Sequence, residues 1–276
     1  MKLKALFLNK MKLIKKILKE GKIKSMSGET GVGSTGEAHL AILEGKKYLL
    51  RICSDNKTSR KYLAYYHKFK KYGFLPKLLE INGKYMLFEF IEGKMCDEEE
   101  TSKTIYKVGR ICAIINKFPA EKDYKIKKNF LEKLKEIKTK KIISKELAEK
   151  VKKEYNLLKK RVDLKYSLDA GDVTCDNFMV DTNGKVYFVD IEAIKSNIKG
   201  MGIAKAFSTW FKKEDEQKKF RKGYNSINSI KFYDKNYAKL VTLIFFINRI
   251  RFKAQKGEQD YVKRTINKLE RLLETK

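Results

Sequence analysis

The spacing of apolar residues divides the chain into a strand-rich first third and a mainly helical remainder. Residues 1–20 have apolar side chains at helical intervals, among them Leu6, Ile14 and Ile17, and Gly21 is a typical helix stop. Shorter segments with strand-like composition follow this helix. They predict strands at residues 22–29, 37–43 and 47–53, with a glycine-rich turn between the first two.

A helix and a hairpin complete the first third of the chain. Aromatic residues at helical intervals predict a helix over residues 57–72. Two apolar segments flank Asn82-Gly83 and predict a hairpin over residues 78–91, because Asn-Gly is the strongest short hairpin signal. We interpret Glu92-Gly93 as a linker.

The chain beyond this linker is mainly helical and contains one further hairpin. That hairpin is predicted over residues 178–190, around Asn183-Gly184. Helices are predicted at residues 103–117, twice within 126–160, and at 237–252 and 260–273. We therefore expect an α+β protein with two lobes: a small β-rich lobe of residues 1–91, with its extra helix 1–20, and a larger helical lobe of residues 92–276.

Composition excludes several classes of protein. The chain has 276 residues, of which 42% are hydrophobic, so it can bury a sizeable core. No run of 18 apolar residues occurs, which excludes a transmembrane helix. The four cysteines form no CxxC pair, so neither a zinc site nor a disulfide framework is indicated, and four free thiols indicate the cytoplasm.

The charge is strongly positive and allows two interpretations. Lys and Arg total 64 and Asp and Glu total 34, which gives a formal net charge of +30. Such a charge suits a surface for nucleic acid, anionic lipid or an acidic substrate. Lysine outnumbers arginine by 55 to 9 and is spread throughout the chain, which favours a general compositional bias instead.

One segment has the opposite charge. Between residues 163 and 192 there are seven acidic residues and two basic ones. Carboxylate oxygens are the ligands that divalent cations prefer. A magnesium site is therefore expected within this acidic segment.

The glycine-rich turn matches the pattern GxGxxG over residues 31–36. A dinucleotide-binding loop of this pattern, or a Walker A loop, must be followed by a helix, whereas residues 37–53 predict a strand, a turn and a strand. A glycine-rich loop within a hairpin that covers phosphates is the arrangement of kinases. The predicted phosphate-binding residues of this loop are Gly31, Gly33, Ser34 and Gly36.

Three polar residues in the acidic segment have the spacing that phosphoryl transfer requires. Asp172 and Asn177 form a D-x4-N pattern, and Asp190 follows 13 residues after Asn177, beyond the hairpin. Phosphoryl transfer needs one carboxylate to orient the attacking hydroxyl and two oxygen ligands to hold Mg²⁺ against the phosphates. This spacing predicts Asp172 as the catalytic base and Asn177 and Asp190 as the metal ligands.

These motifs resemble the aminoglycoside phosphotransferase and choline kinase branch of the protein-kinase-like superfamily. Residues 170–177 resemble its HGDxxxxN loop, and Val189-Asp190-Ile191-Glu192 resembles its IDWE or IDFE motif. The resemblance covers about residues 22–254. It implies a bilobal protein-kinase-like fold and ATP- and Mg²⁺-dependent phosphorylation of a small-molecule hydroxyl. It further implies that Arg51 holds phosphate and that backbone groups of Glu89 and Ile91 hold adenine.

The sequence departs from the family pattern at three places. Ala170 replaces the loop histidine, residues 57–72 contain no glutamate to pair with the third-strand cation, and Gly202-Ile203-Ala204 replaces a DLA-like sequence. Two alternatives therefore stay open. One is an atypical protein kinase of the RIO kind, and the other is a nucleotide-binding pseudokinase or RNA-associated scaffold.

The charge of the helical segments bears on the acceptor. Residues 101–150 carry 15 Lys or Arg against 6 Asp or Glu, and residues 201–276 carry 19 against 8. Basic walls repel cations at long range. We therefore expect a neutral or anionic acceptor, such as a sugar, a phosphorylated metabolite or an RNA end, rather than an aminoglycoside.

Overall fold

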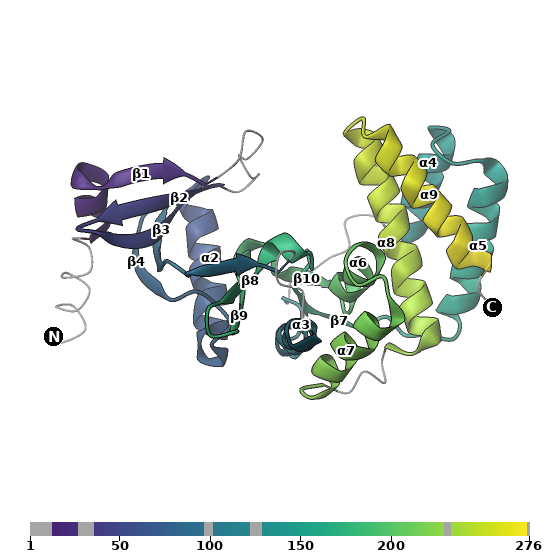
Figure 1. Cartoon of the computed structure of the whole chain (residues 1–276). Coiled ribbons are helices and arrows are strands. Elements are labelled where there is room, and N and C mark those ends of the chain that lie inside the picture. The colour runs from purple at the N-terminus through teal and green to yellow at the C-terminus, as the bar shows by residue number, and fades with distance from the viewer. Residues whose placement is uncertain (1–12, 27–35, 97–101, 122–128, 229–232, 275–276) are drawn as a thin grey trace. The chain divides into compact units, whose positions relative to one another are not determined.

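The computed structural model divides the chain into two compact units (Figure 1). It describes residues 13–26, 36–96, 102–121, 129–228 and 233–274. The first unit comprises Met1–Thr104 and Cys175–Ala193, and the second unit comprises Ile105–Thr174 and Ile194–Lys276. The lobe boundary expected at residue 91 stays a prediction.

The first unit contains a five-stranded antiparallel sheet with the order β1-β2-β3-β5-β4. Gly83 has a positive φ of 59° in the turn between β4 and β5, as the hairpin signal Asn82-Gly83 predicts. Residues 27–29 of the first predicted strand lie outside the described part of the chain. The strands are β1 (Lys22–Ser25), β2 (Gly36–Leu43), β3 (Lys46–Cys53), β4 (Leu78–Asn82) and β5 (Tyr85–Glu89).

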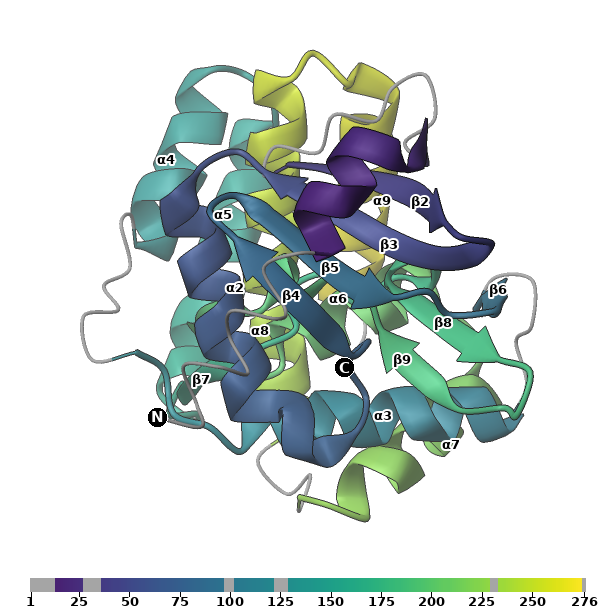
Figure 2. The same ribbon diagram turned by 90° about the vertical axis from the view of Figure 1, so that its left-hand side faces the viewer.

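Successive side chains of β3 point to opposite faces of this sheet. Leu50 packs in one apolar cluster with Ile14 and Ile17 from the helix of residues 13–20, which lies across the sheet in Figure 2. Arg51 points to the opposite face, where its guanidinium lies 5.5 Å from the ring centre of Tyr62 in α2 (Asn56–Phe69). The face with Arg51 is thus separated from the N-terminal helix by the thickness of the sheet.

Glu80 connects the described part of the N-terminal helix to the sheet. Its carboxylate is 5% exposed and accepts the backbone N–H of Ile14 at 3.0 Å. The first N–H groups of a helix have no partner within the helix, so a buried carboxylate is well placed to accept them. Burial raises the pKa of Glu80, and hydrogen bonds from the backbone of Ile14 and Leu13 oppose that rise.

A second, three-stranded sheet completes the first unit. It has the order β6-β8-β9, with β6 (Gly93–Met95), β8 (Phe178–Asp181) and β9 (Val186–Phe188). The hairpin predicted around Asn183-Gly184 is confirmed as β8 and β9. The predicted linker at Glu92-Gly93 is wrong at Gly93, which begins β6 and pairs with Asp181. A glycine is needed there because a Cβ atom would lie 2.1 Å from the carbonyl oxygen of Val180.

The second unit is mainly helical, as predicted. It also contains the antiparallel strand pair β7 (Tyr166–Asp169) and β10 (Lys195–Ile198), and β7 leads into the loop of Asp172. The helices are α3 (Ser102–Asn116), which begins in the first unit, α4 (Phe130–Thr139), α5 (Lys145–Lys159), α6 (Met201–Thr209), α7 (Glu214–Asn225), α8 (Lys235–Gln255) and α9 (Gln259–Glu274).

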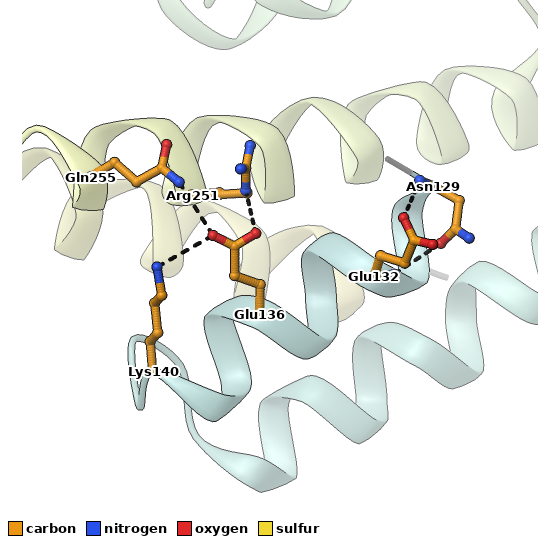
Figure 3. A network of polar contacts seen from close by, with 6 residues as sticks. All are labelled: Asn129, Glu132, Glu136, Lys140, Arg251 and Gln255. Carbon is orange, nitrogen blue, oxygen red and sulfur yellow. Dashed lines mark hydrogen bonds and ion pairs between the residues drawn. The ribbon is translucent and has the colours of Figure 1, made fainter. Parts of the chain in front are cut away.

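Helix α8 is the central element of the second unit and contacts α4, α5, α6 and α9. Its middle is apolar on all sides, as expected of a helix surrounded by other helices. Toward its C-terminal end, Arg251 donates to Glu136 of α4 at 2.7 Å, and Gln255 donates to the same carboxylate at 3.2 Å (Figure 3). This network joins α4 to one face of α8.

In the part of the chain that the structure describes, every helix is too short or too polar to span a lipid bilayer.

Candidate functional site

A buried carboxylate shapes the loop that contains Asp172. Asp169, at the end of β7, is 1% exposed and accepts the backbone N–H groups of Gly171 at 2.8 Å and Gly202 at 2.9 Å. Asn116 donates to the same carboxylate at 3.2 Å and accepts the hydroxyl of Tyr224 at 2.9 Å. Burial raises the pKa of Asp169, and these hydrogen bonds oppose the rise.

This network explains two departures from the family pattern. Ala170 is 2% exposed, and the adjacent Asp169 orders the loop at the position where the family has a histidine. A Cβ atom on Gly202 would lie 2.7 Å from the Asp169 carboxylate, so the larger side chain of a DLA-like aspartate would not fit there. The scaffold of the loop is therefore built differently, around Asp169.

Asp172, the predicted base, lies at the exposed end of this loop. Its side chain is 46% exposed and forms an ion pair with Lys205 of α6. The hydroxyl of Thr174 donates to the same carboxylate oxygen at 3.3 Å. An exposed carboxylate in a fixed loop can contact a substrate and accept a proton from it.

Lys205 is itself unusual, because its residue is only 7% exposed. Burial lowers its pKa to about 8, and the nearby cations Arg249 and Lys253 of α8 act in the same direction. The sequence does not single out Lys205, because one lysine among 55 carries no signal of its own.

The first unit brings together the two predicted metal ligands. The backbone N–H of Val189 donates to the carbonyl of Asn177 at 3.0 Å, and Phe178 pairs with Phe188 in the hairpin. Asn177 and Asp190 therefore flank the same end of this hairpin. Asp172 precedes the short helix Cys175–Asn177 and belongs to the second unit.

Asp190 lies in a cluster of like charges. Burial raises its pKa to about 7, and the carboxylates of Glu192 and Asp176 raise it as well, while Arg51 acts in the opposite direction. Arg51 also forms an ion pair with Glu192, and both side chains are 16% exposed. The glutamate partner that residues 57–72 lack is therefore supplied by Glu192.

The donor set at this end of the hairpin fits a magnesium ion. Among the described residues, no three acidic, histidine or cysteine side chains converge as a metal-binding group. Mg²⁺ does not require such a group, because one or two protein oxygens, the substrate phosphates and water complete its shell. Burial and the neighbouring carboxylates disfavour the ionised form of Asp190, and a bound cation would favour that form.

The predicted nucleotide-binding residues are only partly described. Gly31, Gly33 and Ser34 lie outside the described residues, while Gly36 begins β2 with a positive φ of 148°. Glu89 ends β5, and its backbone N–H donates to the carbonyl of Lys77 at 2.9 Å. Ile91 lies in the segment between β5 and β6. Their contact with a nucleotide stays a prediction.

Comparison of the sequence with protein-family models and with curated proteins gives no match. Solved structures do match over nearly the whole chain. Choline kinase LicA from Streptococcus pneumoniae is 16% identical, with a TM-score of 0.64 over 98% of this chain and 99% of that one.

Two other phosphotransferases give similar values. Spectinomycin phosphotransferase APH(9)-Ia, solved with ADP and spectinomycin, is 16% identical, with a TM-score of 0.66 over 92% of this chain and 93% of that one. Ethanolamine kinase from Plasmodium vivax is 13% identical, with a TM-score of 0.64 over 97% and 86%. The chain has the bilobal protein-kinase-like fold of these proteins, with a small β-rich part and a larger helical part.

Proposed function

We propose that this chain belongs to the aminoglycoside phosphotransferase and choline kinase group and transfers the γ-phosphoryl group of ATP to a hydroxyl of a small molecule. The observation that carries the proposal is the loop anchored by Asp169, which presents Asp172 five residues before Asn177. The fold shared with the solved choline kinase, spectinomycin phosphotransferase and ethanolamine kinase supports it.

Asp172 accepts the proton of the acceptor hydroxyl in this proposal. As the oxygen of that hydroxyl forms its bond to the γ-phosphorus, the bond from phosphorus to the β–γ bridging oxygen breaks, and ADP leaves with that oxygen. The proton stays on the Asp172 carboxylate until solvent removes it. The exposure of this side chain, 46%, allows both the acceptor and water to reach it.

Asn177 and Asp190 would hold Mg²⁺, which neutralises the phosphate charge that develops during transfer. Arg51 binds phosphate oxygens in this proposal, and its ion pair with Glu192 orients the guanidinium. The backbone of residues 31–36 encloses the phosphates, and backbone groups of Glu89 and Ile91 bind the adenine.

We place the reaction in the cytoplasm, where ATP is available and thiols stay reduced. All four cysteines, Cys53, Cys96, Cys112 and Cys175, are free thiols, which supports this assignment.

A phosphorylation screen tests the proposed function. The full chain is incubated with MgATP and a panel of hydroxyl compounds, and ADP formation is measured against the Asp172→Ala variant. We expect ADP formation that depends on both an acceptor and Asp172. Binding of MgATP without transfer to any acceptor would favour the pseudokinase alternative, and equal turnover by the Asp172→Ala variant would refute the role of Asp172.

A further inference from the structure

The surroundings of Asp172 in the second unit are cationic. Lys205 forms an ion pair with Asp172 and is 7% exposed, so its ammonium group is held beside the carboxylate that is to accept the acceptor proton. A buried cation with one carboxylate partner is costly unless further contacts compensate for its lost hydration. The positive charges of Arg249 and Lys253 in α8 also act against the charge of Lys205.

The cationic side chains on two faces of α8 have different partners. Arg251 and Gln255, four residues apart and therefore on one face of the helix, bind Glu136 of α4 (Figure 3). Arg249 and Lys253 share another face, and both lie over the ring of Tyr261 in α9, each at 4.8 Å from the ring centre. Lys253 also pairs with Glu258. Each face thus has a carboxylate partner in the helical bundle, Glu136 for the first and Glu258 for the second, and the cations of the second face also act on Lys205.

Tyr261 also lines a cavity whose wall carries further cationic residues. Thr209, one turn after Lys205, donates its hydroxyl to the Lys205 carbonyl at 2.8 Å, and both Thr209 and Tyr261 line a cavity of about 410 Å³. Among the described residues that line it there is no carboxylate. Its charged residues are Lys212, Arg264, Lys268 and Arg271.

The cations at the cavity wall lie close enough to affect one another. Lys268 donates to the carbonyl of Ser208 at 2.8 Å, and burial lowers its pKa, as do Lys212 and Arg264. Such a set of cations lowers its own electrostatic energy when an anion binds. Phosphate and carboxylate groups match this chemistry, because both lysine and arginine donate charge-assisted hydrogen bonds to them.

We propose that the acceptor is an anionic hydroxyl compound, whose phosphate or carboxylate group is bound by Lys205, Arg249 and Lys253 beside Asp172. The proposal rests on the proposed phosphotransferase function and specifies its substrate class. The basic cavity next to Tyr261 accommodates the rest of a larger acceptor or a second anionic group. A cationic acceptor is disfavoured because it would have to displace or approach Lys205 to reach Asp172.

Matched sets of compounds test this inference. Each set keeps one carbon skeleton and changes the charge: glycerol, glycerol 3-phosphate and serinol in the first set, and glucose, glucose 6-phosphate, gluconate and glucosamine in the second. Binding to the full chain is measured by calorimetry with saturating MgADP, so that the nucleotide site is already filled. We expect an anionic member to bind at least about tenfold more tightly than its neutral counterpart, and the cationic member to bind most weakly.

Variants distinguish a local site from the general positive charge. Lys205→Met should reduce the anionic preference to about threefold or less without changing the affinity for MgADP. Arg251→Gln removes one charge from the same region of α8 but not from the proposed site, so it should retain the wild-type preference. If Lys205→Met does not fold, the Arg249→Gln, Lys253→Gln double variant makes the same test at less buried positions.

Three results would overturn the inference. They are equal or tighter binding of a neutral or cationic member, retention of the anionic preference by the Lys205 and double variants, and failure of every anionic member to bind while MgADP binds. Failure of MgADP itself to bind would refute the proposed function instead. The compounds are then titrated without nucleotide, and anion binding that depends on Lys205 still decides whether the anionic site exists.

Discussion

Each carboxylate to which the proposed mechanism assigns a chemical role lies beside a second charged side chain. Asp172 pairs with Lys205 in the second unit, and Asp190 adjoins Glu192 and Arg51 in the first. The two environments differ in sign, since the neighbour of Asp172 is a cation and the strongest charged influence on Asp190 is an acid. Replacement of Asp172 and replacement of Asp190 should therefore affect the proposed reaction in different ways.

In the proposed mechanism Asp172 acts on the acceptor and not on the nucleotide. Its replacement by alanine should therefore lower the rate of transfer by about 10²-fold or more and leave the affinity for MgATP nearly unchanged. Asp190→Ala should weaken MgATP binding itself, because it removes a proposed metal ligand. Nucleotide affinity from calorimetry and turnover from ADP release separate the two effects. The opposite result, with Asp172 controlling nucleotide affinity, would contradict the proposed roles of both residues.

The anionic preference should depend on pH through Lys205. Its pKa is lowered to about 8 by burial and by Arg249 and Lys253, while the facing groups on the loop are Asp172 and Thr174. Because a lysine is charged below its pKa, the preference should be full at pH 7 and decline as the pH rises through 8. Binding of glycerol 3-phosphate relative to glycerol at pH 7 and pH 9, in wild type and Lys205→Met, measures this decline. A preference that is unchanged at pH 9 would remove Lys205 from the site.

The lowered pKa of Lys205 also determines how the free energy of unfolding depends on pH. The pKa of Lys205 is about 8 in the folded protein, against an ordinary value of 10.5. Between pH 8 and 10.5 the unfolded chain therefore binds more protons than the folded chain. The contribution of Lys205 to the free energy of unfolding therefore increases as the pH rises through this window, and it is lost below pH 8.

At the scale of elements, α8 carries two sets of charged side chains: Arg251 pairs with Glu136, and Arg249 and Lys253 act on Lys205. Glu136 accepts from Arg251, Gln255 and Lys140, at 2.7, 3.2 and 3.4 Å respectively. The first of these contacts joins two largely buried side chains, with exposures of 27% for Arg251 and 17% for Glu136. The contact of Lys140 is more exposed, with 56% of the lysine side chain accessible.

This difference predicts unequal stabilities for two variants of the network. Arg251→Gln should lower the free energy of unfolding by about 1–3 kcal/mol, because it leaves a mostly buried carboxylate with weaker partners. Lys140→Gln, the matched control on the same carboxylate, should change it by less than about 0.5 kcal/mol, since exposed ion pairs contribute little. Urea unfolding followed by circular dichroism gives both values, and equal effects would refute the ranking.

At the scale of the whole molecule, binding of MgATP should raise the melting temperature. A ligand that binds only the folded protein stabilises it by about 2.7 kcal/mol at roughly 100 times its dissociation constant. The rise should require Mg²⁺ and should be largely lost in Asp190→Ala. An unchanged melting temperature in millimolar MgATP would count against the whole functional proposal.

The general architecture could be predicted from the sequence because its signals are local. Asn82-Gly83 and Asn183-Gly184 specify their hairpins through turn geometry, and the apolar spacing of residues 237–252 specifies part of α8. The spacing of Asp172, Asn177 and Asp190 could be recognised for the same reason.

The electrostatic partners could not be predicted, because they are brought together by tertiary packing. Lys205 follows Asp172 by 33 residues, and Glu192 follows Arg51 by 141. Nothing in the local sequence distinguishes these residues from other lysines and glutamates. Asp169 was visible only as one acid in an acidic segment, because its burial depends on Asn116, Gly202 and the helices that carry them.

The helix of residues 13–20 covers apolar residues on one face of the five-stranded sheet. Its Ile14 and Ile17 cover Ala41, Leu50 and Leu87, all of which are fully buried. A shortened chain that begins at Gly21 would present this apolar surface to solvent and leave the Glu80 carboxylate without the Ile14 N–H. We expect such a chain to self-associate, as sedimentation velocity would detect, while Arg51 on the opposite face keeps its ion pair with Glu192.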